Sequence, residues 1–151
     1  MVRLKTRYIL FQLRYPDFED TKTAKNVQPK TLISILRASM SKNFGDIGLS
    51  ETLNAFTIKY FSNSTSVGIL RVHCDAVEKV LGAMFFVSSV DGKNVIWDSI
   101  GVSGSISKCE RRAIKINRRI LRDGKNNDND DQNENVDDVL DIFVNKDIDG
   151  L

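Results

Sequence analysis

The sequence predicts an α+β domain built on a four-stranded antiparallel sheet. Residues 54–61 and 67–73 carry alternating or β-branched apolar side chains on either side of a short turn rich in Ser and Asn, which is the pattern of a β-hairpin. A strand and a helix are predicted before this hairpin, and a helix and a strand after it. The order β-α-β-β-α-β is the ferredoxin-like pattern, shared by RRM-like domains, with both helices on one face of the sheet.

The first strand is predicted at residues 2–13. Phe11 and Leu13 lie on one of its faces, and Tyr8 and Leu10 lie on the other. A strand with apolar residues on both faces is typically central in its sheet, and right-handed crossovers place the return strand of the hairpin centrally as well. The charged start of the first strand lacks the unbroken apolar run of a secretory signal, so we expect a strand there instead.

The first helix follows a long charged loop. Pro29 suits the first turn of a helix, and Leu32, Leu36 and Met40 recur at the spacing of an amphipathic helix. Gly45 is expected to stop this helix, with a further turn before the hairpin.

The second helix is expected after Asp75 and Glu78, which resemble a capping box with Asp75 as the cap. The dipeptide Asp91-Gly92 then marks a turn. The last strand of the sheet is predicted at residues 95–106, where Gly101 indicates a bend or a bulge.

A third helix, added to the ferredoxin-like order, is predicted at residues 108–122. Ser107 and Glu110 resemble a second capping box at its start, and Asp123-Gly124 ends it. One face of this helix is apolar: Cys109, Ala113, Ile116 and Ile120. Most of its basic residues, with Glu110 and Asp123 as local offsets, lie on one broad face: Lys108, Arg111, Arg112, Lys115, Arg118, Arg119, Arg122 and, just beyond the helix, Lys125.

The basic side chains of this helix lie three and four residues apart, so they repel one another. A run of charge is often only a solvated face of a helix. Six Lys and Arg residues between positions 111 and 122, without an interleaved acid, favour contact with phosphate groups instead.

Charge divides the chain into two regions, a folded domain at residues 1–124 and an acidic tail at 125–151. Residues 1–125 hold 21 Lys and Arg against 11 Asp and Glu, a net charge of +10, whereas residues 126–151 hold 1 against 9, a net charge of −8. The tail is low in complexity and predicted to be disordered. Its apolar residues are either incidental or part of a short acidic helix that docks on a basic partner or on the domain itself.

A basic domain indicates an anionic partner, nucleic acid first. Arg3, Lys5 and Arg7 form a second basic group, at the start of the first strand. Lys59 and Arg71 are isolated strand positions that are either simply solvated or, if they share an open sheet face, extend the basic surface. The return strand lacks the aromatic residues on which RRM domains stack bases, so binding to RNA shape and backbone is expected.

No catalytic residue, metal site or cofactor is predicted. His73 is the single histidine, and no second ligand lies at a suitable spacing from His73 and Cys74. Cys74 and Cys109 are expected to be two reduced thiols. No phosphate-cradling Gly-Lys-Ser/Thr loop is present, and Arg14 is followed by acids without a glycine, which disfavours an acylphosphatase-like activity. The sequence contains no run of about 18 apolar residues, so no membrane helix is predicted.

Four segments stand out along the chain: VRLKTRYILF at 2–11, FGDIG at 44–48, KYFSNSTSVGILR at 59–71 and VSGSI at 102–106. In order and spacing they resemble the POP-five family of protein subunits of eukaryotic ribonuclease P and RNase MRP, in particular its fungal members. The charged loop at residues 14–28 and the tail after Gly124 have no counterpart in this resemblance.

The resemblance implies an RRM-like fold without base stacking, in a non-catalytic subunit of a ribonucleoprotein whose RNA carries the active site. It implies a role in removing the 5′ leader of precursor tRNA and in processing precursor rRNA, in the nucleus and nucleolus. The implied partners are the catalytic RNA, a TIM-barrel-like protein subunit and other subunits of the particle. The alternative is a stand-alone protein-interaction or general RNA-binding module of the same fold.

Overall fold

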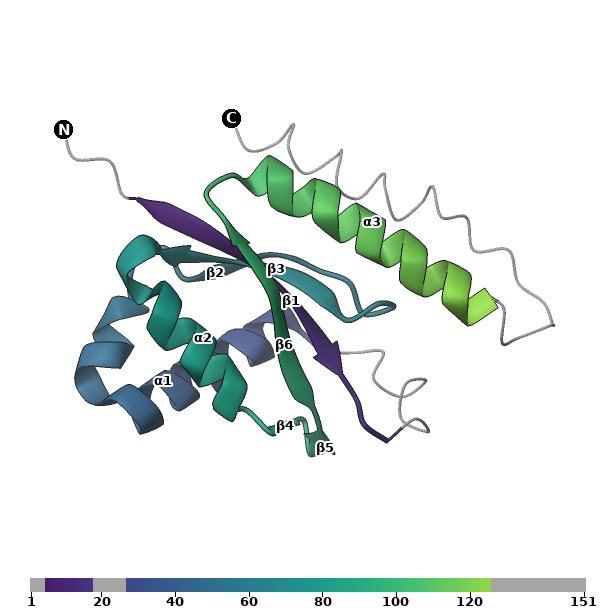
Figure 1. Cartoon of the computed structure of the whole chain (residues 1–151). Coiled ribbons are helices and arrows are strands. Elements are labelled where there is room, and N and C mark those ends of the chain that lie inside the picture. The colour runs from purple at the N-terminus through teal and green to yellow at the C-terminus, as the bar shows by residue number, and fades with distance from the viewer. Residues whose placement is uncertain (1–4, 18–26, 126–151) are drawn as a thin grey trace.

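The computed structural model describes residues 5–17 and 27–125. The predictions for Arg3, for the middle of the 14–28 loop and for the acidic tail therefore lie outside the described residues. In chain order the elements are β1 (Thr6–Arg14), α1 (Pro29–Glu51), β2 (Thr57–Phe61), β3 (Val67–His73), η2 (Cys74–Ala76), α2 (Val77–Phe86), β4 (Ser89–Val90), β5 (Lys93–Asn94), β6 (Ile96–Ser103) and α3 (Ile106–Lys125) (Figure 1).

The main sheet has the strand order β2-β3-β1-β6, and every neighbouring pair in it is antiparallel. β1 and β3 are central, which confirms the prediction. The register between β1 and β6 shifts at one point: Leu10 faces Gly101, but Phe11 faces Ser99. Ile100 is the extra residue of this bulge, so the irregularity predicted at Gly101 is present.

Helices α1 and α2 cover one face of the sheet (Figure 1). Phe11 lies at the centre of this layer, where its ring packs 5.1 Å from Trp97 and 6.2 Å from Phe61, measured between centroids. A Cβ on Gly68 of the adjacent strand would lie 2.5 Å from the ring of Phe11. Only a glycine at this buried position lets the ring lie against the β3 backbone.

Gly45 interrupts α1 but does not end it. Its backbone has φ 65° and ψ −157°, a conformation that glycine adopts without a steric penalty. Helical turns resume after this kink and continue to Glu51. The predicted stop is therefore a bend between two helical segments, and the predicted buried stripe of Leu32, Leu36 and Met40 is confirmed.

Helix α3 covers the opposite face of the sheet (Figure 1). Its predicted apolar stripe faces inward: Cys109 and Ala113 are buried against Leu10, Val67 and Ile69. The sheet therefore has a helical layer on both faces over these residues. No helix among the described residues is long and apolar enough to cross a membrane.

Both predicted capping boxes are wrong in their details. Helix α3 begins at Ile106, so Ser107 lies inside its first turn. Before α2, residues Cys74–Ala76 form a 3-10 turn, and the side chain of His73 caps that turn by accepting the Asp75 N–H through Nδ1 at 3.3 Å. Asp75 is thus the capped residue, while His73 performs the capping.

Candidate nucleic-acid interface

Three side-chain contacts hold α3 against the sheet. The thiol of Cys109 donates to the carbonyl of Tyr8 at 3.5 Å. Near the other end of the helix, Thr65 Oγ1 donates to Asn117 Oδ1 at 2.8 Å, and Asn117 Nδ2 donates to the Tyr60 hydroxyl at 3.2 Å. Thr65 and Asn117 are both buried, so losing one partner would leave the other unsatisfied. These contacts fix which face of α3 points away from the sheet.

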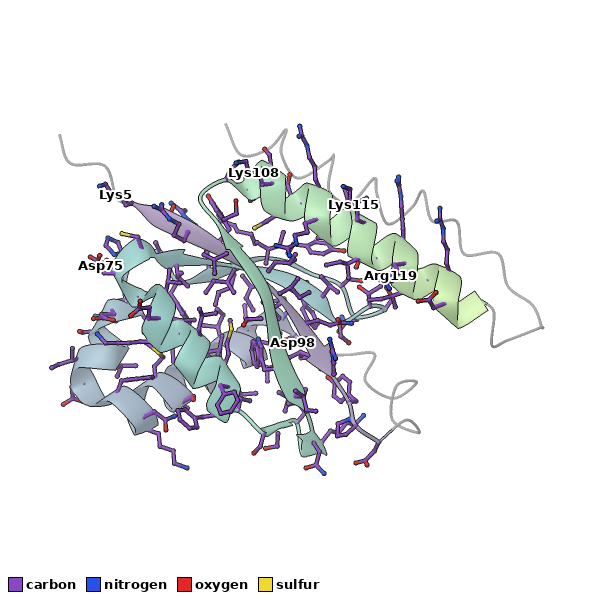
Figure 2. The ribbon with its side chains drawn as sticks, in the orientation of Figure 1. Lys5, Asp75, Asp98, Lys108, Lys115 and Arg119 are labelled. Carbon is purple, nitrogen blue, oxygen red and sulfur yellow. The ribbon has the colours of Figure 1, made fainter. Side chains whose placement is uncertain are left out.

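The exposed surface of α3 carries seven basic side chains, which we call the cationic ridge. They are Lys108, Arg111, Arg112, Lys115, Arg118, Arg119 and Arg122, all of them exposed. At 1.5 Å per residue the ridge is about 20 Å long, and Figure 2 shows Lys108, Lys115 and Arg119 spaced along the helix. Within the described residues, no ridge side chain forms a salt bridge or hydrogen bond. The structure thus brings all predicted basic residues from 108 to 122 onto one surface.

The other predicted RNA contacts are more scattered. Lys5 is exposed just before β1, and Arg7 is half-buried and donates from Nη1 to the Thr6 carbonyl at 2.9 Å. Arg71 pairs in register with Tyr8, which packs on the α3 side of the sheet. The Nε of Arg71 is buried without a hydrogen-bond partner among the described residues. Lys59 is exposed at a register shift in β2, so it does not follow Arg71 in a regular row.

An RRM-type stacking platform is blocked in this molecule. RRM domains stack bases on the central strands of the sheet. Here the corresponding positions, Leu10 and Ile69, are fully buried beneath α3. This arrangement agrees with the prediction from sequence that bases are not read by stacking on these strands. It leaves the cationic ridge as the surface that replaces the open sheet face.

Sequence reasoning missed one group of possible metal ligands. The ligand atoms of His73, Cys74 and Asp75 lie within 4.8 Å of one another. However, His73 Nδ1 accepts the Asp75 N–H, so a neutral ring carries its proton on Nε2 and has no free lone pair. The capping role of His73 explains this cluster without a metal ion.

The ionisable groups beneath α3 show no catalytic activation. Burial raises the pKa of the Cys109 thiol, and the nearby Arg112 only partly opposes this effect. Burial also raises the pKa of Tyr60, although hydrogen bonds from Ser62 and Asn117 act in the opposite direction. A raised pKa keeps a thiol protonated, whereas a nucleophilic cysteine needs its thiolate. Cys109 therefore serves the packing of α3.

Comparisons with known proteins agree with this architecture. Residues 7–114 match the model of the Rpp14/Pop5 family. The chain is 36% identical over 124 residues to the ribonuclease P/MRP protein subunit POP5 of Schizosaccharomyces pombe, covering 78% of this chain and 89% of that one. It is 37% identical over 141 residues to the subunit of the same name from Saccharomyces cerevisiae, covering 80% of each chain.

A solved structure shows the same fold at low sequence identity. A chain in the cryo-EM structure of yeast ribonuclease MRP superposes with a TM-score of 0.53 at 13% identity, over 83% of this chain and 98% of that one. Fold and surface together define a ferredoxin-like domain that carries a polycationic helix on the second face of its sheet. The chain belongs to the Rpp14/Pop5 family.

Proposed function

We propose that this chain is a non-catalytic protein subunit of the ribonuclease P and RNase MRP ribonucleoproteins, and that its cationic ridge binds phosphates of their catalytic RNA. The observation that carries the proposal is the ridge itself: seven exposed basic side chains, without salt bridges among the described residues, on a helix clamped to the sheet. Like charges at this spacing destabilise a helix. Phosphates of an RNA backbone would neutralise these charges, and the relief of their repulsion would favour binding.

The proposed subunit supports cleavage of precursor tRNA and precursor rRNA by holding the RNA that performs it. The pKa of the Cys109 thiol is raised and His73 caps a turn, so both residues have structural roles, which supports the proposal of a non-catalytic subunit. The names of the curated relatives support the choice of particle. We accordingly propose that the chain acts in the nucleus and nucleolus, which imaging of the tagged chain would test.

A second surface favours a protein partner within the same particle. Phe85 and Phe86, at the end of α2, are 81% and 58% exposed, and their rings meet edge to face at 5.7 Å between centroids. Exposed aromatic pairs of this kind are typical of interface anchors. We propose that they contact a neighbouring protein subunit, for which a TIM-barrel-like subunit is our first candidate. This surface lies in the α1/α2 layer, whereas the RNA-binding ridge belongs to α3.

The ridge is tested by charge reversal with a matched control. The double variant Arg111→Glu, Arg118→Glu changes two ridge charges, and Lys30→Glu, Lys42→Glu changes two exposed charges of α1 by the same amount. We expect the ridge variant to recover less ribonuclease P and MRP RNA when the tagged chain is purified from cells. In vitro, its slope of log affinity against log salt should fall by about 1 for each lost contact.

The control variant should recover both RNAs like the wild type. Equal RNA recovery by the ridge variant and the wild type would show that the ridge is a solvated face. Equal loss in both variants would show that only the net charge of the chain matters, and either result would refute the assignment of the ridge.

A further inference from the structure

The junction between β6 and α3 contains a pocket with a volume of about 410 Å³. Its wall is formed by the end of the strand, including Gly101 and Ser103, and by the first turns of the helix. The apolar part of its lining consists of Leu10 and Cys109, which are buried, and Val102, which is exposed. Two cations of the ridge, Lys108 and Arg112, also line it. The remaining ridge residues do not.

Arg112 lies in this pocket against Gly101, the residue that follows the bulge in β6. A Cβ added to Gly101 would overlap Nη1 of Arg112 and lie 3.3 Å from its Cζ. The guanidinium therefore rests against the strand backbone at the residue next to the bulge. Only a residue without a side chain leaves room for it there. Arg112 thus has a defined seat, unlike a cation that simply extends into solvent.

A third cation approaches the same junction from β1. Nη1 of Arg7 lies 3.9 Å from the position of a Cβ on Gly104, in the turn that connects β6 to α3. Beside it, Ser103 Oγ accepts the Ser105 N–H at 3.2 Å, so the Ser103 hydroxyl proton remains available to a ligand. Two basic groups and a hydroxyl therefore line the pocket, and Arg7 lies beside the adjoining turn.

We propose that this pocket binds a single phosphate group of the RNA backbone, held by the Arg112 guanidinium together with Lys108 and Ser103, with Arg7 beside it. The planar guanidinium presents paired donors that match two phosphate oxygens, which the point charge of a lysine does not. Among the described residues, no acidic side chain lines the pocket, so none of them neutralises its cations there.

This inference rests on the proposed function because it assigns the phosphate to RNA. The same chemistry would also fit the phosphate of a free nucleotide. The proposed phosphate pocket differs from the rest of the cationic ridge in one testable respect. Phosphates attracted by the ridge respond to charge alone, whereas the pocket requires the shape of the Arg112 guanidinium and the space at Gly101.

Two charge-conserving variants separate these cases. Arg112→Lys keeps the charge but loses the paired donors, and Arg118→Lys makes the same change outside the pocket. We expect Arg112→Lys to weaken binding of a fluorescent single-stranded RNA by about tenfold, and Arg118→Lys by about twofold or less. Fluorescence anisotropy with the full-length chain measures both, and equal effects of the two variants would overturn the proposal.

Gly101→Ala tests the seat of the guanidinium without changing any charge. The three atoms nearest to the added methyl group all belong to the Arg112 side chain, and the backbone of Gly101 does not require glycine. The domain should therefore keep its melting temperature while Arg112 is displaced. We expect Gly101→Ala to reproduce the loss seen in Arg112→Lys, and the double variant to lose little more, because both changes remove one interaction. Losses that multiply would refute a shared site.

The ligand is identified by following the Arg112 side-chain Nε–H signal by NMR during titration with RNA, uridine monophosphate or inorganic phosphate. A shift that saturates with RNA at a much lower concentration than with the two small ligands supports a backbone phosphate. A tighter response to uridine monophosphate than to RNA would overturn the RNA assignment and indicate a nucleotide site. If the Arg111/Arg118 variant loses RNA binding but Arg112→Lys behaves like Arg118→Lys, the proposed function stands and the pocket alone fails.

Discussion

On one face of the sheet, α1 and α2 enclose a cluster of 18 buried apolar residues among those described, whereas the cluster beneath α3 contains five. The larger cluster contains the stacked aromatic residues around Phe11. The smaller one is supplemented by polar contacts, chiefly that between Thr65 and Asn117. Charge is distributed in the opposite way, because the ridge lies entirely on α3.

This difference indicates that the two layers have separate tasks. Burial of apolar area is the dominant source of stability, so the α1/α2 layer stabilises the domain. The α3 layer buries less and carries mutually repelling charges, so its own docking contributes less stability. It is therefore the layer in which charge can be concentrated for binding without weakening the core.

The largest expected difference comes from two neighbouring residues of β3. Leu70 points into the α1/α2 cluster and Ile69 into the α3 cluster, and both are fully buried. Replacing such residues by alanine costs about 2–5 kcal/mol, depending on how far the surroundings can collapse. We expect Leu70→Ala near the upper end of that range and Ile69→Ala near the lower end, because α3 can settle onto the sheet. Denaturant unfolding of both variants measures this, and an equal or larger cost for Ile69→Ala would contradict the division of tasks.

A smaller effect is expected from the buried polar contact under α3. Asn117→Ala leaves the Thr65 hydroxyl without its acceptor, which costs about 1–3 kcal/mol. Hydrogen exchange should accelerate in α3 while α1 and α2 keep their protection, because the lost contact belongs to the outer layer. The control Ser39→Ala removes the bond from the Ser39 hydroxyl to the Ala83 carbonyl at 2.9 Å, between α1 and α2. Faster exchange throughout the domain in Asn117→Ala would show that the layers unfold as one unit.

The α1/α2 layer was largely predictable from sequence because its pattern is periodic. The alternation along β1 identified Phe11 and Leu13 as one face, and the spacing of Leu32, Leu36 and Met40 identified the buried stripe of α1. These signals are local, since each depends only on the repeat of a strand or a helix. On the α3 side of the sheet, Gly101 was recognisable by the same kind of local signal, a glycine within a strand.

The α3 layer was only partly predictable because its arrangement depends on tertiary contacts. The apolar stripe with Cys109 and Ala113 was visible in the sequence. Such a stripe can pack on any apolar surface, so the sequence did not show that α3 packs on the second face of the sheet. The pairing of Thr65 with Asn117 joins residues 52 positions apart. The placement of Arg112 over Gly101 depends on the register of a bulge. No periodic pattern records these relations.

The smallest expected effect is a loss of stability at alkaline pH that arises mainly beneath α3. The pKa values of Cys109 and Tyr60, both under this helix, are raised by burial above their ordinary values of 9.0 and 10.0. As pH rises past these ordinary values, the unfolded chain releases the two protons first, so the folded state loses stability. Tyr15, beside the α1/α2 cluster, also has a raised pKa, because of burial and the nearby Asp91.

The two layers are separated by comparing variants in urea between about pH 8 and pH 10.5, a window that spans the titration of both group types. Tyr60→Phe with Cys109→Ala should flatten the fall of unfolding free energy with pH more than Tyr15→Phe does, because it removes two such groups instead of one. A loss of unfolding free energy from the missing Tyr60 hydroxyl that is the same at every pH leaves the slope of unfolding free energy against pH unchanged. A steeper slope in the double variant than in Tyr15→Phe would show that the alkaline sensitivity arises mainly in the α1/α2 layer, contrary to the expectation from the raised pKa values beneath α3.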